Sequence, residues 1–176
     1  MAALADVLTG LRALIALLLV AMVGRGRLDT AVALLAVAWL TDFFDGRSAR
    51  AATRPTHLGQ WDLGVDTFVG AGVMVGLALG GYVNWGVGLL AVVVLGGGWV
   101  LLGNTALSSA LQATAYGVLM WQAYTTEAQG WWLPPVVIVI MAAINWNRFI
   151  HDSIPGFFAG IADLYTSARQ LVRRPS

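Results

Sequence analysis

Residues 41–68, TDFFDGRSARAATRPTHLGQWDLGVDTF, hold four aspartates between two apolar runs. The run VALLAVAWL precedes this stretch, and the run VGAGVMVGLALG follows it. A carboxylate next to an apolar helix is costly unless a counter-charge or a ligand compensates it. The stretch therefore predicts two apolar helices joined by a polar loop, with a compensated cluster of charge where the helices end.

The composition places the whole chain in the membrane class. Of its 176 residues, 59% are hydrophobic and only 11% are charged, whereas soluble domains carry about 25% charged residues. A formal charge of +1 gives no reason to expect a nucleic-acid partner. Because the chain has no cysteine, disulfides and thiolate metal sites are excluded.

The apolar stretches are long enough for several membrane spans, since a spanning helix needs about 20 apolar residues. We expect an all-α bundle of six transmembrane helices with a polar cavity on the cytoplasmic side, forming one catalytic domain over residues 1–150. Residues 151–176 are expected to be a tail that forms an amphipathic surface helix. The predicted spans are 7–24, 28–46, 61–83, 85–103, 106–126 and 130–149. Within them, residues 96–98 (GGG) should weaken the fourth span, and residues 134–135 (PP) should kink the sixth.

The distribution of arginine predicts the orientation, because basic residues favour the cytoplasmic side. With a cytoplasmic N-terminus, Arg25 and Arg27 lie outside and the other arginines lie inside. This orientation puts the charged cluster at the cytoplasmic face of a multi-pass protein, which we expect in a prokaryotic cell membrane. The arginines expected inside are Arg12, Arg47, Arg50, Arg54, Arg148, Arg169, Arg173 and Arg174.

The helical rise predicts how deep the charges lie. Both Arg12 and Asp42 are thirteen residues from the outer turn between the first two spans. At 1.5 Å per residue each lies about 20 Å from that turn. We therefore expect Arg12 and Asp42 at the same height, slightly inside the cytoplasmic edge of the bilayer.

The spacing of the aspartates groups them into two pairs. Asp42 and Asp45 share one helix face, and Asp62 and Asp66 share another. Four carboxylates in a poorly solvated cavity repel one another, and divalent cations relieve that repulsion. Oxygen ligands without cysteine favour Mg²⁺ or Mn²⁺. Hydrogen-bonded packing or a proton path remains the alternative for any single aspartate.

Residues 42–50 (DFFDGRSAR) and 59–66 (GQWDLGVD) resemble a known family signature. The signature is D-x2-D-G-x2-A-R-x8-G-x3-D-x3-D, that of the CDP-alcohol phosphotransferases, membrane enzymes of phospholipid synthesis. The first half matches at each position. The second half has two residues, instead of three, between Gly59 and Asp62.

The resemblance implies a role for each matched position. Asp42, Asp45 and Asp62 would bind two metal ions, Mg²⁺ or Mn²⁺, that hold the diphosphate of CDP-diacylglycerol or another CDP-alcohol. Asp66 would be the catalytic base for the acceptor hydroxyl, and CMP would leave. The residues implied in binding the nucleotide and the donor are Gly46, Ala49, Arg50 and Gly59.

Residues 6–12 (DVLTGLR) resemble a weaker family motif, N-x-[IL]-T-x2-R, with aspartate in place of asparagine. Donor or acceptor phosphates could contact residues from both motifs and from later in the chain, namely Thr9, Arg12, Arg54 and Arg148. The resemblance also implies a homodimer. Gly72, Gly76 and Gly80 form a stripe that should pack closely, either within one protomer or across that dimer.

Three functions remain open from the sequence. The first is phosphatidyl transfer to a small alcohol, with glycerol 3-phosphate ranked first and inositol phosphate second as acceptor. The second is a small cation or proton transporter that uses the same intramembrane aspartates. The third is a family member that binds nucleotide without turnover.

Overall fold

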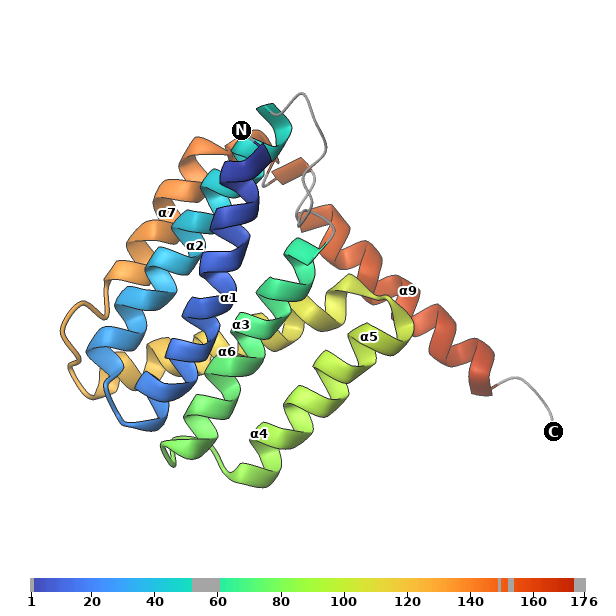
Figure 1. Cartoon of the computed structure of the whole chain (residues 1–176). Helices are drawn as coiled ribbons and strands as arrows, with labels where there is room; N and C mark the ends of the chain where they lie inside the picture. The colour runs from blue at the N-terminus through green and yellow to red at the C-terminus, as the bar shows by residue number, and fades with distance from the viewer. Residues whose placement is uncertain (1, 52–60, 149, 152–153, 173–176) are drawn as a thin grey trace.

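A computed structural model gives the structure of this chain and describes residues 2–51, 61–148, 150–151 and 154–172. Every regular element within these ranges is helical (Figure 1), which confirms the all-α prediction. The elements in order are α1 (Ala2–Gly24), α2 (Leu28–Ala51), α3 (Asp62–Leu79), α4 (Trp85–Ala91), a π-helical segment (Val92–Gly97), α5 (Gly98–Leu102), α6 (Thr105–Thr125), α7 (Leu133–Ile144), α8 (Trp146–Arg148) and α9 (Ile154–Val172).

Local sequence explains most of the helix ends. The turn after α1 has Gly26 at a φ of 71°, and the backbone N–H of Arg27 donates to the carbonyl of Met22 at 2.9 Å, as in a glycine-terminated helix. The side chains of Asn84 and Asn104 cap α4 and α6, each accepting from a backbone N–H at 2.9 Å. Gly103, with a φ of 66°, ends α5.

Several helices begin or end a few residues from the predicted boundaries; α1 begins at Ala2 and α3 ends at Leu79. α2 continues to Ala51, five residues past the predicted end, so Gly46 lies inside the helix and does not break it. The sixth predicted span, 130–149, is α7 only from Leu133 to Ile144. Its two prolines occupy the first turn, where a missing N–H costs nothing, so they start the helix and do not kink it.

The fourth predicted span forms a continuous helical stretch with a local change of geometry. α4 passes into the π-helical segment Val92–Gly97, which passes into α5. The π-helical segment includes Gly96 and Gly97, where the sequence predicts a weakened helix. Glycine has the least stable α-helical backbone apart from proline, so a change of hydrogen-bond pattern is cheapest there.

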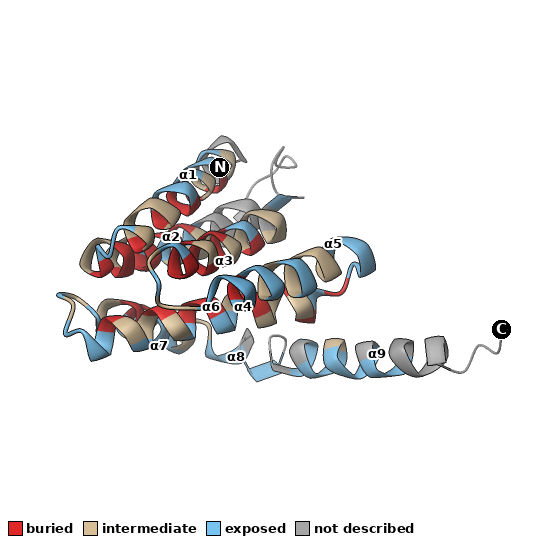
Figure 2. Ribbon diagram, turned by 90° about the horizontal axis from the view of Figure 1, so that it is seen from below, coloured by how far each residue is buried: buried red, intermediate tan, exposed pale blue. Residues whose placement is uncertain are grey.

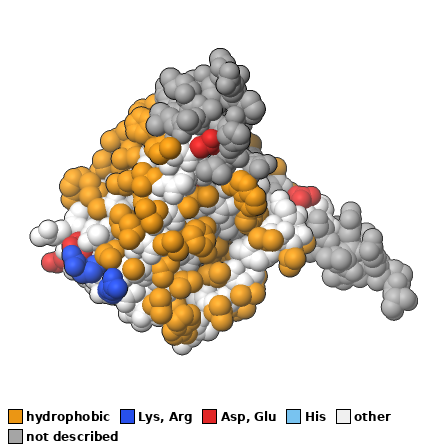
Figure 3. Space-filling model, in the orientation of Figure 1, with side chains coloured by type: hydrophobic (Ala, Val, Ile, Leu, Met, Phe, Trp, Pro, Cys, Tyr) orange, Lys and Arg blue, Asp and Glu red, His pale blue; other side chains and the backbone are white. Residues whose placement is uncertain are grey.

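Two stretches of the described chain are long and apolar enough to cross a membrane, Asp6–Gly24 and Trp85–Leu102. Leu63–Leu79 and Leu133–Ile144 are apolar but shorter. Large hydrophobic side chains cover much of the face in Figure 3. Exposed apolar surface on this scale is typical of proteins that contact lipid or a partner. The count of six spans stays a prediction.

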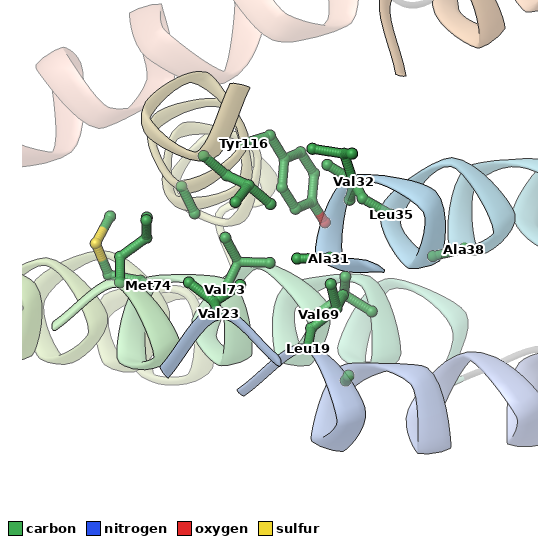
Figure 4. Close-up of a cluster of buried hydrophobic side chains, with 14 of the residues drawn as sticks. Leu19, Val23, Ala31, Val32, Leu35, Ala38, Val69, Val73, Met74 and Tyr116 are labelled. Atoms are coloured by element: carbon green, nitrogen blue, oxygen red, sulfur yellow. The ribbon is translucent and has the colours of Figure 1, made fainter. Parts of the chain in front are cut away.

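The core lies where α1, α2, α3 and α6 meet, and buried residues concentrate on their facing sides (Figure 2). Alanines on α1, α2 and α6 are fully buried there, which lets the backbones approach closely. Tyr116 reaches from α6 towards α2 and lies near Val32 and Leu35 (Figure 4). The residues at the centre of the core are Leu19, Val23, Val32, Leu35, Val73, Leu77 and Leu119.

The glycine stripe of α3 packs against α1 within the protomer. A Cβ at Gly72 would lie 2.9 Å from the carbonyl oxygen of Ala16, and one at Gly76 would lie 2.8 Å from the Cβ of Val23. A Cβ at Gly80 would lie 2.8 Å from the carbonyl oxygen of Val23. The structure therefore assigns this stripe to the contact between α1 and α3.

Replacing Gly76 with alanine should destabilise the protein, because the new methyl group overlaps the Val23 side chain. Overpacking of this kind costs about 1–3 kcal/mol. The matched control is Gly117→Ala on α6, where a new Cβ would have no heavy atom within 4 Å. There the substitution should stabilise the helix by about 0.5–1 kcal/mol. Thermal unfolding in detergent would measure both, and the same sign for both variants would contradict the packing.

Helix α9 extends away from the bundle in Figures 1 and 2. It is attached at the start of α6, where the side-chain amide of Asn104 donates to the carbonyl oxygen of Gly160 at 3.2 Å. Phe158, Ile161 and Tyr165 are exposed and follow one another at helical spacing. The location of this helix at a membrane surface stays a prediction.

Candidate functional site

Arg12 of α1 forms the centre of a charged cluster between three helices. Its Nη1 atom donates to Oδ1 of Asp42 on α2 at 2.8 Å and also to Oδ1 of Asp66 on α3. The Arg12 side chain is only 1% exposed, whereas those of Asp42 and Asp66 are 40% and 24% exposed. The guanidinium thus supports both carboxylates from the buried side, and part of each carboxylate remains open to a ligand.

The helix packing brings these three side chains together. The glycine stripe lets α3 lie close along α1, so Asp66 comes within reach of Arg12. On α2, the hydroxyl of Thr41 donates to the carbonyl oxygen of Ala38 at 2.7 Å. Thr9 is buried one turn before Arg12 on α1.

The predicted equal height of Arg12 and Asp42 agrees with the structure, and their depth in a bilayer stays a prediction. Arg12 and Asp42, expected at one height because each is thirteen residues from the outer turn, are joined by the 2.8 Å ion pair. The sequence did not predict that Asp66 would share the same guanidinium. It named Arg12 as a possible contact for a substrate phosphate, which stays a prediction; among the described side chains, the guanidinium pairs with the carboxylates of Asp42 and Asp66.

A small cavity of about 50 Å³ opens between these residues and α6. Besides Arg12, Asp42 and Asp66 it is lined by three polar or aromatic residues that sequence reasoning missed, together with Ala38 and Val69. The missed residues are Trp39, Gln112 and Tyr116. The rings of Trp39 and Tyr116 meet edge to face, with centroids 5.4 Å apart, and close one wall.

The signal that could have found the α6 residues is present in the sequence. Ser108, Gln112 and Tyr116 follow one another at intervals of four, which places them on one helix face. Ser108 is fully buried and Tyr116 is 9% exposed. Polar side chains on one face of a predicted membrane span indicate that this face turns to the protein interior.

The structure places the other predicted site residues only in part. Asp45, Gly46, Ala49 and Arg50 lie on the last turns of α2, and their side chains are outside the described residues. Asp62 begins α3, one turn before Asp66, and its side chain is likewise outside that part.

Arg54 and Gly59 fall wholly outside the described residues, so the short step from Gly59 to Asp62 is not tested. Arg148 ends α8, and its side chain is also not described.

The cluster offers oxygen ligands of the kind that Mg²⁺ and Mn²⁺ prefer. Among the side chains that the structure describes, no three of the types His, Cys, Asp and Glu come together as a metal site. The predicted ligand set contains one described carboxylate, that of Asp42, and two on neighbouring turns of α2 and α3, those of Asp45 and Asp62. The partly open carboxylate of Asp42 is compatible with this set.

A larger hollow in the described part of the chain is a different feature. A groove of about 570 Å³ is lined by Trp61, Gly64, Phe68 and Trp99, among others. Gly64 and Phe68 are each two residues from Asp66, about 200° around a helix of 3.6 residues per turn. The groove therefore lies on the face of α3 turned away from Asp66, and the described residues that line it carry no charge.

Comparison with known proteins places the chain in a family. Residues 2–151 match the family of CDP-alcohol phosphatidyltransferases. No curated protein and no solved structure matches the chain. The matched region covers most of the chain and includes Arg12 and all four aspartates of residues 42–66. The family suggested by the signature is thus confirmed, and the chain belongs to the CDP-alcohol phosphatidyltransferase family.

Proposed function

We propose that this protein transfers a phosphatidyl group from CDP-diacylglycerol, or a related group from another CDP-alcohol, to a small alcohol and releases CMP. One observation carries this proposal within the family match. Arg12 draws the carboxylates of Asp42 and Asp66, from two different helices, to one point beside a cavity. A transferase of this kind needs a site at which groups that bind the donor and groups that activate the acceptor lie side by side.

Asp42, Asp45 and Asp62 would hold two divalent ions, Mg²⁺ or Mn²⁺. Bound ions of this kind supply charge neutralisation at the donor diphosphate. Asp42 is suited to this role because Arg12 contacts it from the buried side and its side chain is 40% exposed. Arg12 also lowers the repulsion between the carboxylates, so the folded protein can hold them close together before a ligand binds.

Asp66 would act as the general base. Its carboxylate takes the proton of the acceptor hydroxyl as the acceptor oxygen forms a bond to the phosphorus next to the lipid. The bond between that phosphorus and the oxygen of the CMP phosphate breaks, and CMP leaves. Arg12 holds the carboxylate of Asp66 beside the cavity, where it would meet the acceptor hydroxyl.

The remaining assignments stay proposals from the family signature. Gly46 and Ala49 would let the nucleotide lie close to the end of α2, and Arg50 would contact a donor phosphate. Gly59 belongs to the same donor site. Thr9, Arg54 and Arg148 would contact phosphate groups of the acceptor or the donor. Arg12 would do so through any N–H groups that the carboxylates leave available.

We further propose a six-span, multi-pass protein in a prokaryotic cell membrane, with its N-terminus and active site in the cytoplasm, which works as a homodimer. Arg25 and Arg27, in the turn between α1 and α2, lie at the other end of α1 from the cluster. This placement supports an orientation with the carboxylates at the cytoplasmic edge. A lipid-linked donor would then enter from the bilayer and meet a soluble acceptor.

Purified protein should release CMP from CDP-diacylglycerol when Mg²⁺ or Mn²⁺ and the right alcohol are present. The panel of acceptors begins with glycerol 3-phosphate, followed by inositol phosphate and then unphosphorylated alcohols. Chelation with EDTA should abolish the release, and added Mn²⁺ should restore it. If folded protein releases no CMP with any acceptor and any divalent ion, the proposal is wrong.

The transporter alternative makes a different prediction for the same preparation. A cation or proton carrier should give flux in proteoliposomes without nucleotide or lipid donor. The ion pairs of Asp42 and Asp66 with the buried Arg12 argue against a relay, because a fixed positive charge opposes the passage of cations.

A further inference from the structure

A chain of hydrogen bonds runs from α3 to α6 beside the carboxylates. The hydroxyl of Thr67 donates to the backbone carbonyl of Leu63 at 2.7 Å, and its oxygen lies 2.5 Å from the hydroxyl oxygen of Ser108. The side-chain amide of Gln112 donates through Nε2 to the same oxygen of Ser108 at 3.0 Å. Thr67 is 5% exposed and Ser108 is fully buried.

The number of hydrogens available decides which group donates in each of these hydrogen bonds. A hydroxyl has a single hydrogen to donate. The Thr67 hydrogen goes to Leu63, so the Thr67 oxygen must accept from Ser108. The Ser108 hydrogen is then used, so its oxygen accepts from Gln112. These hydrogen bonds therefore require that Nε2 of Gln112, and not its oxygen, faces Ser108. They fix the orientation of the Gln112 amide.

Gln112, the last residue in this series of hydrogen bonds, lies at the proposed active site. Gln112 lines the small cavity that Arg12, Asp42 and Asp66 also line, whereas Ser108 and Thr67 are not among its lining residues. α6 cannot shift easily in this region, because a Cβ at Gly70 of α3 would lie only 3.0 Å from the Cγ of Gln112. An oriented amide that lines the same cavity as two carboxylates can act as a positioning group.

The size of the cavity selects what can occupy it. Sites for drug-sized ligands measure about 300–1,000 Å³, whereas this cavity measures about 50 Å³. A nucleotide or an acyl chain therefore does not fit into it. A cavity needs about 10–15 Å³ of this kind of volume to hold one water, so the space is large enough for a small polar group such as two neighbouring hydroxyls. The alcohol end of the acceptor is the part of the reaction that has this size.

We propose that Gln112 positions the acceptor, with its side-chain amide bonded to a second hydroxyl next to the one that gives its proton to Asp66. The inference rests on the proposed function and adds a substrate class, alcohols with at least two neighbouring hydroxyls. Gln112 acts as a positioning residue in this scheme, since the proton goes to Asp66 and the new bond forms at phosphorus.

The experiment compares two acceptors that differ only in the second hydroxyl. Glycerol 3-phosphate has it, and 3-hydroxypropyl phosphate lacks it; if the acceptor panel selects inositol phosphate, the matching deoxy analogue takes this place. Wild-type protein should prefer the diol by at least about tenfold in kcat/KM, because a site built to bind a hydroxyl rejects the analogue without it. Gln112→Leu should raise KM for the diol and remove the preference, with activity on the analogue and KM for the donor unchanged.

Two further variants separate positioning from loss of structure. Ser108→Ala lies outside the cavity lining and removes the anchor of the amide, so it should weaken the preference in the same direction. Gln122→Leu makes the same exchange about 15 Å further along α6 and should leave the preference intact. If Gln112→Leu fails to fold, Gln112→Asn tests the same point, because it withdraws the amide by one carbon.

Each result decides between distinct outcomes. If Gln112→Leu and Gln112→Asn keep the preference for the diol, the cavity holds only water and the inference is wrong. If the wild-type protein turns over both acceptors equally, the inference is wrong while the proposed function stands. If the wild-type protein releases no CMP at all, the proposed function fails first, and the inference fails with it.

Discussion

Asp66→Asn should lower CMP release by about 10²–10⁴-fold, the range that a positioned general base contributes. The amide has the shape of the carboxylate, and its oxygen can still accept a hydrogen bond from Arg12, so the helix packing should survive. The amide, however, cannot take the proton of the acceptor hydroxyl. The measurement is CMP release at saturating donor, acceptor and Mn²⁺, with Mn²⁺ binding followed by calorimetry.

The matched control for this substitution is Asp163→Asn on α9. Asp163 accepts from the side-chain amide of Asn104 at 3.4 Å, far along the chain from the cluster. The control should keep wild-type turnover, and Asp66→Asn should keep most of the Mn²⁺ affinity, because the proposed ligands are Asp42, Asp45 and Asp62. Normal turnover in Asp66→Asn would remove Asp66 from the role of base. Nucleotide binding without turnover in the wild-type protein would identify a family member that has lost catalysis.

Arg12→Leu should lower the free energy of unfolding by about 3 kcal/mol, the lower end of the range for removing one partner of a buried ion pair. Leucine fills part of the space but removes the positive charge that lies between the carboxylates of Asp42 and Asp66. We place the effect at the lower end because these carboxylates are 40% and 24% exposed. Thermal unfolding in detergent measures the change, and CMP release should fall as well.

The control is Arg27→Leu, which removes an arginine from an ion pair at the protein surface. Arg27 is 63% exposed, and its Nε lies 3.6 Å from Oδ1 of Asp29. An exposed pair contributes about 0–1 kcal/mol, so this variant should unfold close to the wild-type temperature. Equal destabilisation by the two variants would contradict the central place of Arg12 in the fold.

These two predictions depend on a role for Arg12 that the sequence did not reveal. The motif DVLTGLR and the usual preference of phosphates for arginine indicate a substrate contact. The structure pairs the guanidinium with two aspartates from other helices, with 1% of its side chain exposed. A side chain in that position orients these carboxylates, and its contact with a substrate phosphate stays a prediction.

Helix content and the grouping of the aspartates were predictable because both depend on near neighbours in the chain. Runs of apolar residues predict helices, and intervals of three and four place Asp42 with Asp45 and Asp62 with Asp66. The equal height of Arg12 and Asp42 was also predictable, since it needs only the rise of a helix and the position of a turn. Boundaries were less certain, because prolines 134–135 both disrupt a helix interior and begin a helix well.

By itself, the sequence determined the family, the helical fold class and the four carboxylates on two helix faces, because all of these depend on residues close together in the chain. Only the tertiary structure decided that Arg12 lies between Asp42 and Asp66, that the α3 glycines pack against α1, and that Gln112 joins the site from α6. The physical reason is rotation about the helix axis. Spacing shows which residues share a face, and packing of side chains between helices decides which face turns to which neighbour.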